Sequence, residues 1–222
     1  NNVTLTADGS EKTKGVTRNG ILDGEREAVT ITYVDATQGW ITTSAANEEN
    51  SAIKIPEYLA ATGPDGASGT TDGDYKVHIF TATKTGSNGF SVSAAGNSAG
   101  SNTVEYLVIA GGGGGSGMYY GGGGGAGGYR NSCTEDTYSG DSSSLESALS
   151  VTATSYNVTV GAGGAAQPSN DVNGNNGSNS VFSTITSTGG GGGKSDSPNS
   201  AAPSGGSGGG SQCRGFKIQV QA

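Results

Sequence analysis

Three short stretches of the chain carry residues in spacings that bind nucleotides or metal ions in other proteins. In the first, Gly112, Gly114 and Gly117 satisfy G-x-G-x-x-G, the fingerprint of a dinucleotide site, directly after the apolar stretch 105–110. Such a site needs a helix after the glycines, because the helix N-terminus supplies the N–H groups that bind the pyrophosphate. Glycine recurs throughout the next fifteen residues, and each glycine in a helix costs about 1 kcal/mol relative to alanine. We therefore expect no cofactor here.

The other two stretches depart from their motifs as well. TGGGGGKS (188–195) lacks the first glycine of a phosphate-binding loop, and prolines follow where the helix would run. NDVNGNNGS (170–178) approaches a calcium loop, but Phe182 stands in the place of the bidentate glutamate, which favours a plain Asn/Gly turn. The single histidine, His78, has no visible Ser, Cys or carboxylate arrangement around it. The sequence therefore predicts no metal site, no catalytic residues and no enzymatic activity.

Composition and charge exclude further classes of function. The chain has 222 residues, of which 43 are glycine, 31% are hydrophobic and only 14% are charged, with a net charge of −8. The negative charge opposes binding to nucleic acid and to anionic membranes. No stretch approaches the ~18 consecutive apolar residues of a membrane span, so we do not expect a membrane-embedded protein. Because the chain begins Asn-Asn without a methionine, we expect it to be a piece of a longer protein.

The N-terminal part reads as a β-domain over residues 1–57, for which the resemblance described below implies a role in fibre attachment or oligomerisation. Alternating apolar residues predict strands at 28–35 and 39–44, joined as a hairpin. Trp40, the only tryptophan, is expected to be a packing anchor rather than a ligand platform. Residues 58–73 are rich in Gly, Pro and Asp and are predicted to be a linker.

Residues 74–222 form a second, glycine-rich domain in which short β-like segments alternate with glycine runs. The expected strands are 74–83, 90–94, 105–110, 156–160, 180–186 and 216–220. The glycine runs are 111–115, 121–128, 161–164, 189–193 and 205–210. A flexible linker would need neither runs of similar length nor strands that lead directly into them.

An ordered arrangement of the runs follows from the chemistry of glycine. Without a Cβ atom, glycine backbones can approach each other closely. Extended helices with three residues per turn have no internal hydrogen bonds, so several can bundle and bond to one another. The sequence thus predicts a mainly β fold with almost no α-helix, in which strands lead into a sandwich-like bundle of polyglycine helices.

The same residues resemble a known family. GDYKVHIFTAT (73–83), the long block 90–130, YNVTVGAGG (156–164) and GSNSVFSTITSTGGGGG (177–193) look like the glycine-rich domain of bacteriophage tail-fibre and virion proteins. Residues 15–44 are similar to β-segments near the distal ends of such fibres. In related tip adhesins of T-even-type phages, glycine runs form a polyglycine sandwich, and the loops between runs contact the bacterial receptor.

This resemblance implies a receptor-binding or structural role on the virion surface, outside the cell. The partners that it implies are other virion proteins, in a homotrimer or a fibre, and a host-surface glycan or outer-membrane protein. A purely structural virion protein and a bacterial extracellular filament subunit remain as alternatives. A closed trimer at a fibre end would favour the phage protein, and an open helical array would favour the filament.

A topology can be drawn from the order of strands and runs. If successive runs lead alternately away from the strands and back toward them, three loops lie at the same far end of the bundle. These loops are 116–120, 165–178 and 194–204. The candidate receptor-binding residues in these loops are Met118, Tyr119, Tyr120, Gln167, Asn170, Asp171, Asn173, Lys194, Asp196 and Asn199. Cys133 and Cys213 both follow descending runs, which predicts that they meet at the opposite end in a disulfide.

Overall fold

The computed structural model describes residues 3–6, 8–22, 29–45, 54–97, 99–117, 121–140, 143–169, 171–195 and 201–210. The fold is mainly β, as predicted. Among the described residues the helical segments are two single turns of 3-10 helix, η1 (Pro64–Gly66) and η2 (Gly86–Asn88). Within these ranges, no helix has the length and apolar character needed to cross a membrane.

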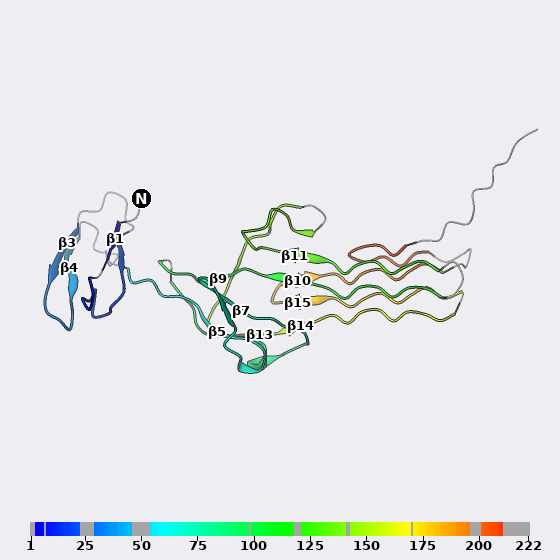
Figure 1. The fold of residues 1–222 in the computed structure, drawn as a ribbon, viewed down its shortest axis with the longest axis horizontal. Helices are drawn as coiled ribbons and strands as arrows, with labels where there is room; N and C mark the ends of the chain where they lie inside the picture. The colour runs from blue at the N-terminus through cyan, green and yellow to red at the C-terminus, as the bar shows by residue number, and fades with distance from the viewer. Residues whose placement is uncertain are drawn as a thin grey trace, which may run out of the picture. The chain divides into compact units, whose positions relative to one another are not determined.

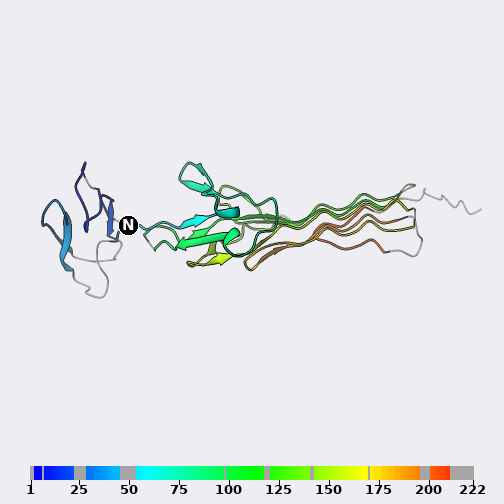
Figure 2. The same ribbon diagram turned by 90° about the horizontal axis from the view of Figure 1, so that it is seen from below.

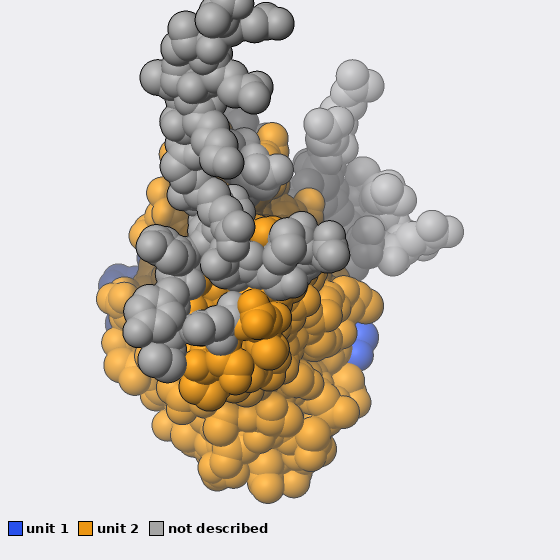
Figure 3. Space-filling model, turned by 90° about the vertical axis from the view of Figure 1, so that its right-hand side faces the viewer, with its two compact units in different colours: residues 1–60, 93–103, 151–153 blue, residues 61–92, 104–150, 154–222 orange. Residues whose placement is uncertain are grey.

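The chain divides into two compact units (Figure 3). The first comprises residues 1–60, 93–103 and 151–153, and the second comprises residues 61–92, 104–150 and 154–222. The first unit contains two antiparallel hairpins (Figure 1), formed by β1 (Val3–Leu5) with β2 (Gly20–Leu22) and by β3 (Val29–Tyr33) with β4 (Trp40–Ala45). The second of these is the hairpin predicted from residues 28–35 and 39–44.

Trp40 begins β4 and has the packing role expected of it. Its ring lies 5.5 Å from that of Tyr33, edge to face, and its Nε1–H donates to Glu11 at 3.2 Å. The neighbouring Gly39 has a φ of 69°, and a Cβ there would collide with the carbonyl of Lys12. Glycine is therefore required where the hairpin passes that carbonyl.

Residues 58–73, predicted from their composition to be a linker, contain short regular elements. They contain β5 (Ala60–Thr62), η1 and β6 (Thr70–Asp72), and β6 pairs with β7 (Tyr75–Val77). Gly66, Gly69 and Gly73 all have positive φ values, so these glycines make the tight turns between short elements. Tight turns and flexible linkers are both rich in Gly, Pro and Asp, so composition alone does not distinguish them.

The remaining strands belong to the second unit or lie at its borders. They are β8 (Phe90–Ala94), β9 (Thr103–Val104), β10 (Leu107–Ile109), β11 (Tyr129–Asn131), β12 (Leu149–Ser150), β13 (Ser155–Tyr156), β14 (Val158–Thr159), β15 (Ser180–Phe182) and β16 (Ile185–Ser187). The sheets are β13–β8–β5, β14–β15–β16, β10–β11 and β9–β12. The single strand predicted at 180–186 is thus a hairpin that turns at Ser183, where φ is 53°.

The apolar core of the second unit is small. Phe90 is buried and contacts His78, Tyr156 and Phe182, with ring centroids 5.5 to 6.5 Å apart. The His78 imidazole packs against the backbone of Gly63, where any Cβ would collide with it. His78 is therefore a packing residue in this cluster, and burial lowers the pKa of its imidazole, with Lys76 adding to the effect.

Six extended runs extend from these strands and lie side by side (Figures 1 and 2). We number them in chain order as 110–117, 121–128, 161–167, 173–179, 188–195 and 201–210, and we call the direction away from the strands outward. The first, third and fifth runs lead outward, and the second and fourth lead back. The expected association of glycine runs is present, and every bond described next joins one run to another.

The hydrogen bonds of the first run repeat every three residues. The donor–acceptor pairs with the second run are Ala110–Gly128, Gly113–Gly125 and Ser116–Gly122, at 3.0, 2.8 and 3.0 Å. Gly111 and Gly114 donate their N–H groups to the fourth run instead, and the carbonyls of Gly112 and Gly115 accept from the third run. A period of three is that of an extended helix with three residues per turn, whereas a β-strand has a period of two.

The spacing of the buried residues also changes where β10 leads into the first run. Along β10 and its flanks, Tyr106, Val108 and Ala110 are buried while the residues between them are exposed. From Gly111 onward the buried positions are 111, 114 and 117. The backbone therefore passes from a strand into a three-residue helix where the apolar residues end and the glycines begin.

The fifth run is the centre of the bundle. Residues 189–193 are all buried, and the run bonds to the first, second, fourth and sixth runs. Gly190 and Gly193 donate to the carbonyls of Gly111 and Gly114, each at 2.8 Å, so the first and fifth runs are parallel. A chain segment without side chains can be buried here because its backbone polar groups find partners on several sides.

The sixth run corrects one prediction. We expected residues 205–210 to lead back toward the strands. Instead, Gly191 and Lys194 donate to the carbonyls of Ser207 and Gly210, at 2.8 and 3.0 Å, so residues 206–210 are parallel to the fifth run and lead outward. The chain first comes inward over 201–205 and then doubles back at a bend at 206–207 (Figure 1, red end of the colour range).

The close packing of the runs depends on the missing Cβ atoms. At most glycines of the runs a Cβ would lie less than 3.0 Å from a backbone atom of another part of the bundle, a separation that real Cβ atoms essentially never show. None of the glycines with positive φ lies beyond Gly86 in the described chain. Glycine is thus needed in the bundle for close approach and not for an unusual backbone conformation.

Two adjacent glycines in the second run allow a matched test. A Cβ on Gly124 would collide with the carbonyl of Gly113, whereas a Cβ on Gly123 would meet no atom within 4 Å. We expect Gly124→Ala to lower the free energy of unfolding by about 1–3 kcal/mol, as overpacking does. Gly123→Ala should change it by less than about 1 kcal/mol. Thermal unfolding followed by circular dichroism measures both, and equal effects of the two substitutions would contradict the packing described here.

Candidate functional site

Three chain reversals lie at the outer end of the bundle, as the topology drawn from the sequence predicts. The described run ends between which the chain reverses are 117 and 121, 167 and 173, and 195 and 201. The described residues beside them are tied together. Gln167 N–H donates to the carbonyl of Gly115 at 3.0 Å, and the carbonyl of Lys194 accepts from Ser116 Oγ at 2.6 Å and from Gly122 N–H at 3.0 Å. The run ends therefore hold the three reversals close to one another.

Six of the ten predicted receptor-binding residues lie outside the described residues: Met118, Tyr119, Tyr120, Asn170, Asp196 and Asn199. The other four are at the outer end. Asp171 is exposed, and Gln167 is half-buried and donates through Nε2 to Oδ1 of Asn175 at 3.1 Å. Lys194 is half-buried, with both its N–H and its carbonyl bonded inside the bundle. The side chain of Asn173 is also used inside the bundle.

Asn173 belongs to a row of asparagines that the sequence analysis missed, which we call the asparagine ladder. The Oδ1 atoms of Asn173, Asn176 and Asn179 accept the N–H groups of Ser195, Gly192 and Gly189, at 2.8, 2.9 and 2.9 Å. The amide nitrogens of Asn173 and Asn176 donate to carbonyls of the sixth run, at 2.8 and 2.9 Å. Each of these two amides thus bridges the fifth and sixth runs.

The asparagine ladder corrects the predicted loop 165–178. Asn175 and Ser178 donate N–H groups to the third run, so this stretch contains most of a run rather than a long reversal. The signal was an asparagine at every third position from 170 to 179, the period of the bundle itself. Asparagine is also common in turns, and for that reason the sequence alone favours a turn at these positions.

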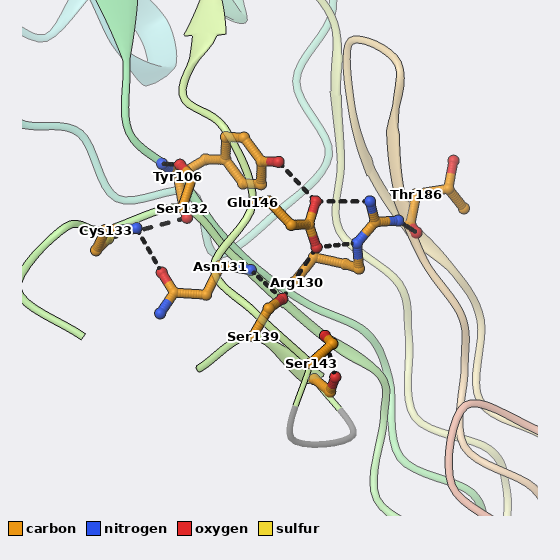
Figure 4. Close-up of polar contacts among 10 residues, drawn as sticks. Tyr106, Arg130, Asn131, Ser132, Cys133, Ser139, Ser143, Glu146 and Thr186 are labelled. Carbon is orange, nitrogen blue, oxygen red and sulfur yellow. Dashed lines mark hydrogen bonds and ion pairs between the residues drawn. The ribbon is translucent and has the colours of Figure 1, made fainter. Parts of the chain in front are cut away.

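A polar cluster lies at the opposite, inner end of the bundle (Figure 4). Arg130, on β11, binds Glu146 through both Nε and Nη2, the latter at 2.6 Å from Oε2. The hydroxyl of Tyr106 donates to Oε2 at 2.7 Å, and Ser139 Oγ donates to Oε1 at 2.9 Å. Arg130 Nη1 donates to the carbonyl of Thr186 at 3.0 Å. The cluster therefore connects β11, β16 and the segment that contains Glu146.

The charges in the polar cluster reinforce one another. Hydrogen bonds from Arg130, which has the largest effect, and from Tyr106 and Ser139 together lower the pKa of Glu146 to about 2, although burial opposes the shift. Burial, together with the bond to Glu146, raises the pKa of Tyr106 to about 12. The bond to Glu146 also raises the pKa of Arg130. At neutral pH the site is an ionised pair whose carboxylate accepts from three side chains, an arrangement suited to holding segments together.

The described part of the chain contains no group of three or more His, Cys, Asp or Glu side chains placed to hold a metal ion. The comparison with protein families does give a match: the glycine-rich domain family matches residues 92–221, more than half of the chain. The chain belongs to the glycine-rich domain family. No curated protein and no solved structure matches it.

The glycine-rich domain spans all six runs, the asparagine ladder and the polar cluster, and it begins within β8. It also contains both cysteines. Cys133 is half-buried, and burial raises the pKa of its thiol, as do the acidic side chains nearby, Glu105 first among them. Cys213 lies outside the described residues. Its predicted disulfide with Cys133 assumed that 205–210 lead inward, and that assumption is wrong, so the pairing stays a prediction without its geometric argument.

The polar cluster makes the stability of the glycine-rich domain depend on pH. Because folding lowers the pKa of Glu146 from 4.5 to about 2, its contribution is complete above about pH 4.5 and is lost as pH falls toward 2. We expect Glu146→Gln to lower the free energy of unfolding at pH 7 by on the order of 2 kcal/mol, a figure reduced for the 40% exposure of the Arg130 side chain. Near pH 2 the variant and the parent should be nearly equal.

Denaturant unfolding at several pH values measures this difference. Glu105→Gln is the matched control, because Glu105 is an exposed carboxylate that bonds only to the hydroxyl of Thr134 among the described side chains. Its effect should stay within about 0.5 kcal/mol. A difference between the parent and Glu146→Gln that is unchanged from pH 7 to pH 2 would show that the ionised pair does not contribute as described.

Proposed function

We propose that this chain is a non-enzymatic structural protein of a bacteriophage virion, a component of a tail fibre or of its tip. In this proposal the loops at the outer end of the bundle bind a receptor on the host surface. The observation that carries the proposal is the gathering of three reversals at one end of a bundle that is hydrogen-bonded along its length.

The bundle separates the requirements of folding from those of binding. Its runs are held by backbone groups, and most of their glycines accept no side chain. The reversals 118–120, 168–172 and 196–200 contain no glycine, so their residues are not among these positions. A surface that must match a host receptor can thus change in the reversals without disturbing the runs. Binding residues on loops held by a rigid scaffold are a common arrangement.

The proposed setting is extracellular, on the virion surface. The proposed partners are other virion proteins, in a homotrimer or fibre, and a host-surface glycan or outer-membrane protein. Tyr119 and Tyr120 are the strongest candidates for the receptor contact, because tyrosine offers a large contact area together with a polar group. A purely structural role in the virion, or in an extracellular filament, predicts instead that substitutions at the reversals leave cell binding unchanged.

Replacing the two tyrosines separates these roles. We expect the double variant Tyr119→Ala/Tyr120→Ala to lose at least about tenfold in affinity for host cells, because two contact residues of an interface centre are removed. The measurement is binding of labelled protein to host cells over a range of concentrations, with the melting temperature determined in parallel.

Tyr138→Ala is the matched control. Tyr138 is 60% exposed and lies in the segment that follows β11, at the inner end of the bundle. It should bind cells as the parent does. The receptor-binding role is refuted if the double variant keeps its melting temperature and also binds cells with the affinity of the parent.

A further inference from the structure

One face of the β10–β11 ribbon exposes large apolar side chains. Leu107 and Ile109 are 50% and 57% exposed, while Val108 between them is buried. Tyr129 stands directly opposite Ile109 in the register of the ribbon and is 37% exposed. Because paired residues lie on the same face, these three side chains form one patch, which we call the ribbon face.

The size of the ribbon face limits what can cover it. Three side chains exposed by about half offer on the order of 300 Å², whereas a stable interface between two proteins buries roughly 800 Å² per partner. The ribbon face is therefore too small to hold a second copy of the chain by itself. One short β-like segment with three apolar side chains is of the right size.

The sequence contains one such segment outside the described residues. Residues 216–220, FKIQV, alternate apolar and polar side chains, so Phe216, Ile218 and Val220 share a face when the segment is extended. Its positively charged Lys217 would point away from the ribbon face. No acidic residue occurs between the end of the sixth run and the end of the chain.

The length of chain is sufficient for this segment to reach the ribbon face. Gly210 is fixed by the bond from its N–H to the carbonyl of Gly123, at 2.7 Å. Six residues separate Gly123 from Tyr129, about 19 Å at the rise of an extended three-residue helix. Eight residues separate Gly210 from Ile218, the middle apolar residue of the segment, and they can span up to about 26 Å, which leaves about 7 Å for a turn. The chain must then turn inward after Gly210 and run toward the strands.

We propose that residues 216–220 dock on the ribbon face, with their three apolar side chains covering those of β10 and β11. The C-terminal segment thereby closes the glycine-rich domain at its inner end, after the sixth run has led outward. This contact joins the last residues of the domain to β10 and β11, and it gives the polar face of 216–220 to the surface.

The test compares two substitutions in the full chain. Ile218→Asp places a charge in the proposed contact, and Gln219→Asp places the same charge on the opposite face. The readout is the relaxation of the Leu107 and Ile109 methyl NMR signals by a water-soluble paramagnetic probe. We expect these methyls to be shielded in the parent and in Gln219→Asp, and at least about threefold more strongly relaxed in Ile218→Asp.

Signals of the glycine runs show in the same spectra whether each variant folds, and Ile218→Ala replaces Ile218→Asp if it does not. Methyls that relax in the parent as strongly as in the Ile218 variant would overturn the proposal. Shielding that increases with protein concentration would also overturn it, because it would assign the ribbon face to a second copy of the chain.

Discussion

The fold depends on one constraint, the close approach of backbones that have no Cβ atoms between them. Collisions would follow at most glycines of the runs if a Cβ were added, and the fifth run is buried although it has almost no side chains. The stability of the bundle therefore comes from hydrogen bonds between runs, while the apolar core around Phe90 is small. This accounts for a chain that is 31% hydrophobic and still folds into a defined structure.

The two ends of the bundle have different tasks. At the inner end the backbone changes from a period of two to a period of three, and the Arg130–Glu146 pair joins β11, β16 and the segment between β11 and β12. At the outer end the run ends hold the three reversals together. Along the side, two amides of the asparagine ladder bond the fourth run to the sixth, two runs that no backbone hydrogen bond joins in the described part of the chain. The polar side chains thus join segments through bonds that glycine, without a side chain, cannot make. The proposed receptor contacts lie outside the runs.

The positions of the runs and the alternating directions of the first five were predictable from the sequence. The lengths of the glycine runs and the strands that precede them indicate where the chain leads away from the strands. The failures also have physical causes. The residues of the bend at 206–207 are glycine and serine, which also occur within the runs. Residue type alone therefore does not distinguish the bend from a run. The asparagines at 173, 176 and 179 favour a turn by residue type, whereas their spacing of three residues matches the period of the bundle. Arg130 and Glu146 are 16 residues apart in an irregular segment, so only the folded chain brings them together.

Amide hydrogen exchange along the first run tests the central claim most directly. The N–H groups of 110, 111, 113, 114 and 116 are bonded to other runs, whereas those of Gly112 and Gly115 have no acceptor in the described part of the chain. A bundle of three-residue helices predicts slow exchange at the first group and fast exchange at Gly112 and Gly115. Uniformly fast exchange would identify the run as a flexible linker, and protection that alternates every two residues would identify a β-sheet; either result would contradict the account.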